Sequence, residues 1–411
     1  MARRVLDRSD APQPTAQGCP FHEVKTIPAD GTPLLPSPSL AEWRAAAPAL
    51  PLQYKDGHVG WIVTRYERAR EVLADDRFTK RPLRMPGEPE IGYDSMPNLT
   101  DEELAALEVG NLITQDPPQH TRVRHVALRQ FSARAVRERE GTVQEIVGRQ
   151  LAHLKAQGSP ADLTEHFALP ISSAVHCRVL GIPESHAQRF SALFAGESEM
   201  HAKLVFLHEL LAIKRADPGD DVISALIESD LTDDEVAGLT RLLLISGHDS
   251  VAYLIVTATL ALLGHPDQLE ALREDPSLID GAIEEFLRFG TMFITLFPRT
   301  ATEDVDFGDW RVAKGESVSV SSVAANRDGR KFDRPDEFDI RRPVSGHLGF
   351  GHGIHGCLGQ QLARLEIREA ISQLLAGLPG LHLVEAEQAS PMPFAHPVAT
   401  YDAGSVIVGW E

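Results

Sequence analysis

One short stretch, residues 347–364, restricts the possible fold more than any other part of the chain. It reads HLGFGHGIHGCLGQQLAR and places Cys357 among five glycines, directly before a segment with helical spacing of apolar residues. Such a loop presents a sulfur beside the N-terminus of a helix, where backbone N–H groups and the helix dipole favour a thiolate over a thiol. A thiolate held in this way is a nucleophile, a redox thiol or a metal ligand.

Two simpler interpretations of Cys357 stay open from these residues alone. A lone cysteine is usually a buried structural residue. A zinc site built from His347, His352, His355 and Cys357 is the other alternative, although it lacks the paired ligand spacing of structural zinc sites.

The composition is that of an ordinary globular chain. It has 411 residues, of which 43% are hydrophobic and 24% charged, and a formal net charge of −19. The acidic balance argues against nucleic acid or an anionic membrane as the main partner. The three cysteines, at positions 19, 177 and 357, are too few and too scattered for a disulfide framework, which fits a cytoplasmic protein.

No segment has the pattern of a membrane anchor. The N-terminus lacks the apolar region of a signal peptide. The longest apolar stretch, residues 242–263, contains Gly247, His248, Asp249 and Ser250, which a lipid-facing helix would not tolerate. We therefore expect this stretch to be a buried core helix and expect no membrane partner.

The pattern along the chain predicts a mainly α protein with small β-sheets near both ends. Residues 1–36 are rich in proline and charge and are expected to form a loosely ordered leader. A capping box, Thr232 with Glu235, opens the longest predicted helix. Helices are predicted at residues 40–47, 66–74, 136–157, 170–180, 184–194, 200–216, 232–263, 266–274 and 277–289, and strands at 50–55, 60–64, 299–301, 310–312, 317–323, 381–385 and 405–410.

The cysteine segment, Phe350-Gly351-x-Gly353-x-His355-x-Cys357-x-Gly359, resembles the haem-binding loop of cytochromes P450. The resemblance implies that the Cys357 thiolate is the proximal ligand of the iron in haem b, iron protoporphyrin IX. It also implies that Phe350 packs near the sulfur, that glycines such as Gly359 let the loop approach the porphyrin, and that His355 reaches a haem propionate.

Two further segments carry cations that suit an anionic group. His120 and Arg124 lie one helical turn apart, and Arg299 follows Phe297-Pro298. Taken alone, such a pair is usually solvated surface. Asp116-Pro117-Pro118-x-His120-Thr121-Arg122-x-Arg124 nevertheless resembles the start of the P450 C-helix, which implies that His120, Arg124 and Arg299 contact the haem propionates.

Glu285 and Arg288 are three residues apart and so share one helix face. An isolated pair of this kind is an ordinary surface ion pair. Its order relative to the cysteine loop resembles the buried Glu–Arg pair of P450s, which has a third, arginine-like partner. Glu337 stands where many relatives have that arginine, so the partner is left open between Arg327 and Arg342.

Ser246-Gly247-His248-Asp249-Ser250-Val251 interrupts the longest predicted helix with polar residues, which costs stability. The simple alternative is a helix–helix contact in which a serine bonds the preceding carbonyl. The functional alternative is a distorted turn over the haem iron. In P450s the matching acid–alcohol pair delivers protons to iron-bound dioxygen, which implies that Asp249 and Ser250 are catalytic. Ser250 replaces the usual threonine, and Ser246 stands where alanine or glycine is common.

As a whole, the resemblance implies a triangular single domain, residues 37–411, with a long central helix over the haem. The expected activity is hydroxylation or epoxidation of a small-molecule secondary metabolite by a monomeric monooxygenase. Dioxygen would be the oxidant, with electrons from NAD(P)H through ferredoxin and ferredoxin reductase. The alternatives are an atypical oxidation (decarboxylation, desaturation or ring coupling) of a peptide-like intermediate, and a haem-binding sensor without turnover.

Family topology also implies which residues line the substrate pocket and where an acidic ferredoxin docks. The predicted pocket wall comprises Met85, Met96, Leu243, Leu244, Ser246, Gly247, Thr291, Phe293, Ile294, Leu296, Phe394 and Ala395. The predicted docking cations are Arg122, Arg129, Arg341, Arg342, Arg364 and Arg368.

Overall fold

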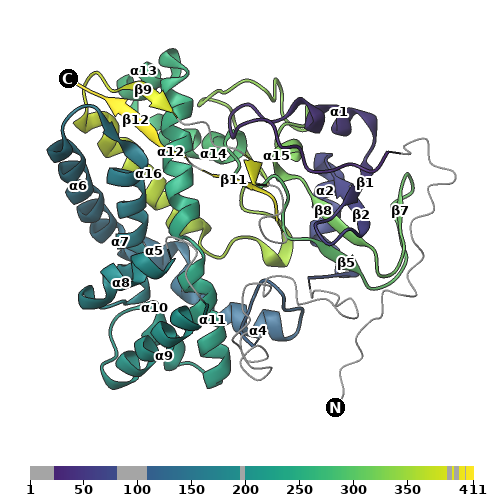
Figure 1. Ribbon diagram of the computed structural model, residues 1–411, viewed down its shortest axis with the longest axis horizontal. Helices are drawn as coiled ribbons and strands as arrows, with labels where there is room; N and C mark the ends of the chain where they lie inside the picture. Colours follow the sequence, from purple (N-terminus) through teal and green to yellow (C-terminus); the bar gives the residue numbers. More distant parts are fainter. Residues whose placement is uncertain (1–22, 81–108, 195–199, 387–390, 393–397, 403) are drawn as a thin grey trace.

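The computed structural model describes residues 23–80, 109–194, 200–386, 391–392, 398–402 and 404–411. Most helices gather on one side of the molecule and the largest sheet lies on the other, with the C-terminus at the periphery (Figure 1). The predicted mainly α architecture with small sheets is confirmed.

The segment before the first helix is held against the sheet. Of the predicted leader, residues 1–22 lie outside the described residues. Lys25 forms a parallel bridge to Leu52, and its N–H donates to the Pro51 carbonyl at 2.8 Å. The Ile27 side chain is buried in the main core.

The largest sheet has five strands in the order β1-β2-β8-β5-β3. The hairpin β1–β2 is antiparallel, with Ala49 opposite Val63, whereas β2 and β8 are parallel. The smaller sheets are β4-β12-β9, β6-β7 and β10-β11. The strands are β1 (Ala49–Gln53), β2 (Val59–Val63), β3 (Phe78–Thr79), β4 (Ala161–Asp162), β5 (Arg299–Ala301), β6 (Val305–Asp306), β7 (Arg311–Val312), β8 (Ser317–Val320), β9 (His382–Ala386), β10 (Pro391–Met392), β11 (Thr400–Tyr401) and β12 (Val406–Gly409).

The helices form the larger part of the fold, and several of them enclose one continuous apolar core. They are α1 (Pro38–Ala46), α2 (Tyr66–Ala74), α4 (Gln119–Gln130), α5 (Ala133–Glu138), α6 (Glu140–Gln157), α7 (Leu169–Leu180), α8 (Glu184–Phe194), α9 (Met200–Ala216), α10 (Val222–Ile227), α11 (Asp233–Ile245), α12 (His248–Leu263), α13 (Pro266–Glu274), α14 (Ile279–Phe289), α15 (Ser322–Ala325) and α16 (Gln360–Gly377), with short π or 3₁₀ turns η2 (Thr164–Ala168), η3 (Pro276–Leu278) and η4 (Gly353–His355).

The longest predicted helix, residues 232–263, begins as expected but is divided in two. The Thr232 side chain accepts from the Glu235 N–H and the Glu235 carboxylate accepts from the Thr232 N–H, which confirms the capping box. The break falls at Gly247, whose φ of +95° lies in the left-handed region that favours glycine.

The predicted core position of the second part is confirmed, since α12 is buried along most of its length and packs against α7, α14 and α16. By length and composition, Asp233–Leu263 would be able to cross a membrane, but 61% of its most apolar window is buried inside the protein.

Two other predicted elements end earlier or divide. The strand predicted at 317–323 stops at Val320, because the Ser321 side chain accepts from the Ala324 N–H and starts α15. The helix predicted at 136–157 is interrupted at Arg139, between α5 and α6.

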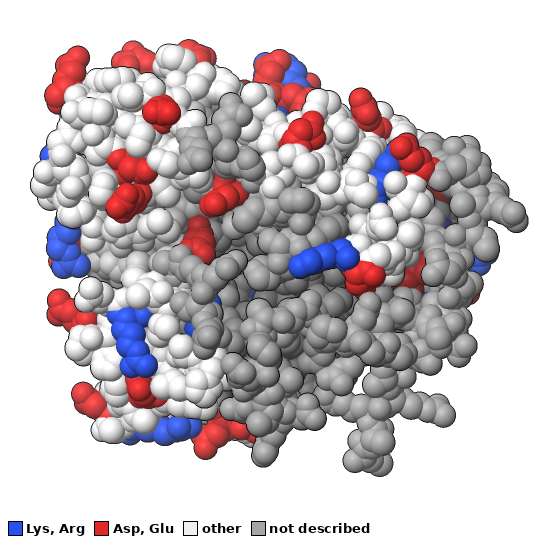
Figure 2. Space-filling model, viewed as in Figure 1, with Lys and Arg blue, Asp and Glu red and all other residues white. Residues whose placement is uncertain are grey.

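On the face shown in Figure 2, acidic and basic side chains are interspersed over the part that the structure describes.

Candidate functional site

The Cys357 loop is closed on itself between the end of the 3₁₀ turn η4 and the start of α16. The Cys357 N–H donates to the Phe350 carbonyl at 2.8 Å, and the Gly351 N–H donates to the Leu348 carbonyl at 3.0 Å. Gly353 has φ +76°, and a Cβ there would lie 2.5 Å from the Leu73 carbonyl oxygen. The glycine is therefore required for the loop to pack against α2, and the loop holds the sulfur beside the first turn of α16.

The acidity of Cys357 reflects two opposing influences. Burial raises the pKa of the thiol, while the Gly359 N–H and the charges of Arg124 and Arg364 act in the opposite direction. We expected the helix N-terminus to favour the thiolate, but burial outweighs it in the haem-free protein. Metal coordination deprotonates a thiol outright, so iron binding would supply what the helix end does not.

The residues predicted to contact propionates come together near this loop. The rings of His120, from α4, and His355 have centroids 4.3 Å apart. Arg124, one turn along α4, donates to the Gly356 carbonyl. Arg299, at the start of β5, is buried and electrostatically coupled to His355. Four cationic or donor groups from three separate segments thus lie in one cluster.

Sequence reasoning missed a fifth member, Lys80, which directly follows β3. Its Nζ lies 5.1 Å from the centre of the Phe297 ring. Burial, with repulsion from Arg299 and Arg124, lowers the pKa of Lys80 to about 7. A lone lysine at the end of a two-residue strand carries no sequence signal of its own, so only the fold reveals it.

The cluster fits an anionic group such as the haem carboxylates. Both ring nitrogens of His120 and Nε of Arg299 are buried without a hydrogen-bond partner among the described residues. Burial and the neighbouring cations lower the pKa of His355 to about 2, and burial lowers that of Arg299 to about 10, although Asp116 partly compensates Arg299. Buried cations need an anion, and the propionates of a haem would provide one.

The predicted catalytic pair lies at the break between α11 and α12. The Asp249 side chain is 66% exposed, and its Oδ1 is 2.6 Å from Nδ1 of the buried His248. Ser250 is partly exposed. From α7, the Ser172 hydroxyl donates to the Gly247 carbonyl at 3.0 Å and also to the His248 carbonyl, which holds the break in place. Ser246 Oγ donates to the Leu242 carbonyl at 2.7 Å, as the simple alternative expected.

The predicted pocket residues divide by burial. Four of them have buried side chains inside the protein: Leu243, Leu244, Thr291 and Ile294. Ser246 is exposed, and Gly247, Phe293 and Leu296 are partly exposed. Ile245, which was not predicted, is 44% exposed, and the next residue, Ser246, is exposed as well. Met85, Met96, Phe394 and Ala395 lie outside the described residues.

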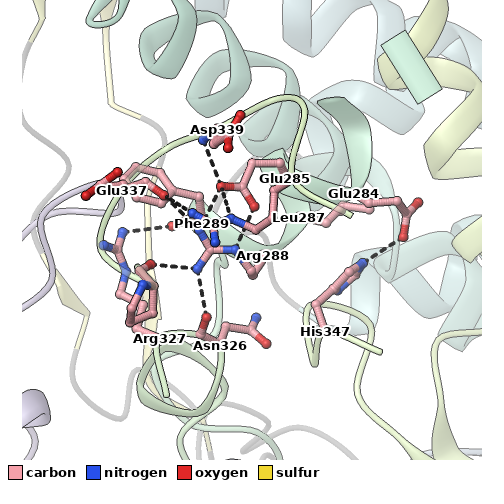
Figure 3. Close-up of polar contacts among 12 residues, drawn as sticks. Glu284, Glu285, Leu287, Arg288, Phe289, Asn326, Arg327, Glu337, Asp339 and His347 are labelled. Carbon is pink, nitrogen blue, oxygen red and sulfur yellow. Dashed lines mark hydrogen bonds and ion pairs between the residues drawn. The ribbon is translucent and has the colours of Figure 1, made fainter. Parts of the chain in front are cut away.

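Glu285 and Arg288 form a buried ion pair in which Arg288 Nε donates to Glu285 Oε2 at 2.6 Å and Nη2 donates to Oε1 at 2.7 Å. Arg288 also donates to the carbonyls of Asn326 and Glu337 (Figure 3). The third partner is Arg342, whose Nε donates to Glu285 Oε1 at 3.2 Å.

The other candidate for this role, Arg327, is engaged elsewhere. Its guanidinium lies 4.0 Å from the centre of the Phe289 ring and donates to the Phe289 carbonyl. Its ionic partner is Asp336, at 3.6 Å. Glu337 contributes only its backbone carbonyl to Arg288 and Arg342 among the contacts of the described residues.

Most of the predicted docking cations have internal partners. Arg342 is buried beside Glu285, and three others form ion pairs with acidic residues of the chain. These pairs are Arg122 with Glu235, Arg364 with Glu284 and Arg368 with Asp280.

Comparisons with known proteins agree with this geometry. The family model described as Cytochrome P450 matches residues 176–378. Cytochrome P450 105C1 of a Streptomyces species is 40% identical over 388 residues, covering 91% of this chain and 95% of the relative. Mycinamicin IV hydroxylase/epoxidase of Micromonospora griseorubida is 34% identical over 345 residues, covering 80% of this chain and 84% of the relative.

Among solved structures, CYP105P1 in complex with filipin I superposes with a TM-score of 0.83 at 33% identity, over 95% of this chain and 99% of that one. The match extends from the sheet through the divided central helix to the cysteine loop. This chain belongs to the cytochrome P450 family, as shown by relatives that share nearly its whole length and in agreement with its cysteine loop, its buried cation cluster and its Glu–Arg–Arg ion pairs.

Proposed function

We propose that this monooxygenase hydroxylates or epoxidises a small-molecule secondary metabolite, with Cys357 as the axial ligand of its haem b. The observation that carries the proposal is the helix break at Gly247, which leaves the Asp249 carboxylate exposed and Ser250 beside it. The relative named mycinamicin IV hydroxylase/epoxidase supports this reaction class.

The haem, when bound, supplies the activation of dioxygen for oxygen insertion, aided by electron donation from a thiolate ligand. Its carboxylates would be held by Lys80, His120, Arg124, Arg299 and His355, which would so orient the ring. Gly359 and the other loop glycines would let the backbone approach the ring, and Phe350 would pack near the sulfur. These residues position the cofactor, while the reaction itself depends on groups at the helix break.

Proton delivery is assigned to two atoms at the helix break. The Asp249 carboxylate would take protons from solvent and pass them to the hydroxyl of the adjacent Ser250. His248 Nδ1 holds one carboxylate oxygen, which leaves the other free to exchange protons. A serine in place of threonine keeps the hydroxyl but loses the methyl group that restricts its rotamer.

Electrons would come from NAD(P)H through ferredoxin reductase and an acidic ferredoxin. Two exposed apolar side chains, Leu128 on α4 and Ile354 on the cysteine loop, support a docking surface on this side, because Arg124 of α4 touches the loop. Arg129 lies next to Leu128. We assign residues 37–411 to one catalytic domain that acts as a monomer in the cytoplasm.

The test combines ligand screening with isotope analysis. Compounds are screened for displacement of the iron-bound water in the absorption spectrum, and binders are then incubated with NADPH, a ferredoxin and its reductase under ¹⁸O₂. A product with one ¹⁸O atom supports the proposal. A product that loses hydrogen or carbon dioxide without gaining ¹⁸O would favour an atypical oxidation, and binding without any product would favour a sensor.

A further inference from the structure

A single carboxylate close to the cysteine loop joins two side chains that the proposed mechanism does not use. Glu284, on α14, accepts from His347 Nε2 at 3.0 Å (Figure 3) and from Arg364 Nε at 2.6 Å and Nη2 at 3.1 Å. His347 opens the cysteine loop and Arg364 lies on α16, so Glu284 holds both sides of the segment that contains Cys357.

The hydrogen bonds of His347 define its tautomer. The Gly349 N–H donates to His347 Nδ1 at 3.1 Å, so Nδ1 is an acceptor and the ring proton resides on Nε2. That proton is donated to Glu284. The His347 side chain is 3% exposed, and Gly349 packs so closely that a Cβ there would lie 2.6 Å from the Leu287 carbonyl oxygen. His347 thus couples α14 rigidly to the start of the loop.

Arg364 contacts Phe350, in the first part of the same loop, through its guanidinium. Its guanidinium lies 4.8 Å from the centre of the Phe350 ring, and the Phe350 carbonyl accepts the Cys357 N–H. A cavity of about 270 Å³ borders Glu284, Phe350 and Arg364. Since one side of this stack is open, polar contacts rather than close packing orient Arg364 over Phe350. They are the ion pair with Glu284 and the hydrogen bonds from Arg364 Nη1 to the carbonyl and the side-chain oxygen of Gln360, both at 3.2 Å.

The charges in this group also act on the sulfur. The Arg364 cation lowers the pKa of the Cys357 thiol against the larger opposing effect of burial. Although burial opposes its ionisation, hydrogen bonds from His347 and Arg364 lower the pKa of Glu284 to about 2, so this carboxylate is charged at neutral pH. Glu284 therefore offsets a positive charge that would otherwise stabilise the electrons on sulfur.

We propose that Glu284 is a positioning residue that sets the reduction potential of the haem iron by holding Arg364 and His347 and by compensating the Arg364 charge beside the Cys357 sulfur. Reduction adds one electron to ferric iron while the sulfur stays a thiolate. An uncompensated cation nearby favours the added electron, and an uncompensated carboxylate disfavours it. The inference rests on the proposed ligation of iron by Cys357.

The chain contains a matched control one helical turn away. Asp280, also on α14, pairs with Arg368, also on α16, at 2.9 Å. Asp280→Asn removes the same charge from the same helix and breaks the same kind of interhelical ion pair. Among the described residues, no contact joins Arg368 to Phe350 or to the cysteine loop.

The experiment measures the ferric–ferrous midpoint potential by spectroelectrochemistry on substrate-free holoenzyme, with dithionite as reductant and no ferredoxin. Glu284→Gln should raise the potential and Arg364→Met should lower it, each by about a tenfold change in the reduction equilibrium, which is 59 mV for one electron. The double variant should return towards wild type, and Asp280→Asn should leave the potential unchanged.

Opposite signs separate charge compensation from general loosening of the loop. If Glu284→Gln and Arg364→Met shift the potential in the same direction, or if Glu284→Gln behaves like Asp280→Asn, the proposal is overturned. Should Glu284→Gln not fold, Arg364→Met alone still decides, because an unchanged or raised potential contradicts it. A wild-type protein without the thiolate-type Soret band of its reduced CO complex would instead overturn the proposed ligation by Cys357.

Discussion

Replacing Glu285 by glutamine should be among the most destabilising single changes in this protein. The Glu285 side chain is fully buried, and its two oxygens accept four N–H donors: two from Arg288, one from Arg342 and the backbone N–H of Asp339. A glutamine would direct an NH₂ group at one or more of these donors. It would also leave two buried guanidinium groups without a counter-charge.

Breaking a buried ion pair by removing one partner costs about 3–5 kcal/mol, and we expect Glu285→Gln to fall in that range. Urea unfolding of the holoenzyme, followed by tryptophan fluorescence and by the Soret band, measures the change in the free energy of unfolding. Glu138→Gln is the control, because its i,i+4 pair with Arg134 is exposed and is worth only about 0.3–0.5 kcal/mol. A loss below about 1 kcal/mol for Glu285→Gln would refute the reasoning.

Three further changes have outcomes that the structure predicts. Lys80→Met should speed haem transfer to apomyoglobin. In haem-free protein, burial lowers the pKa of Lys80 to about 7, whereas the unfolded pKa is about 10. Wild-type stability should therefore fall as pH falls from about 10 to about 7, and Lys80→Met should remove this loss. Glu366→Gln should leave stability at pH 7 within about 1 kcal/mol of wild type or higher, because burial raises the pKa of this carboxyl and so favours its neutral form. It should also abolish the stability loss expected as pH rises above about 4.3, the unfolded pKa, which pH-dependent denaturation would detect. Ser250→Ala should increase the fraction of consumed dioxygen released as hydrogen peroxide, measured with a peroxide assay, whereas an unchanged fraction would remove Ser250 from the proton path.

Local patterns in the sequence were sufficient for elements whose stabilising contacts are also local. The capping box of Thr232 and Glu235 has both of its hydrogen bonds within one turn, and it begins the helix where predicted. The distorted turn expected at Gly247 is a complete break of the helix, because the hydroxyl of Ser172, on α7, bonds the carbonyls released there. That partner lies 75 residues away along the chain, so the sequence around Gly247 contains no trace of it.

The candidate site shows the same limit. His120, Arg124 and Arg299 were predicted because each belongs to a recognisable motif, whereas Lys80 does not and joins them only through the fold. Periodicity likewise does not show which residues at the C-terminal end of α11 are buried and which are exposed. Leu243 and Leu244 are buried in the core, while Ile245 is exposed. The choice between Arg327 and Arg342 depended on the path of a long irregular segment, which no local pattern determines.

The most direct test of the central claim is the absorption spectrum of the reduced, CO-bound protein with Cys357 intact and replaced by serine. The wild-type protein should show a red-shifted, thiolate-type Soret band. Cys357→Ser should still bind haem through its cation cluster but should lack that band. Persistence of the band in Cys357→Ser, or its absence from wild-type protein that contains haem, would contradict the assignment of Cys357 as the iron ligand.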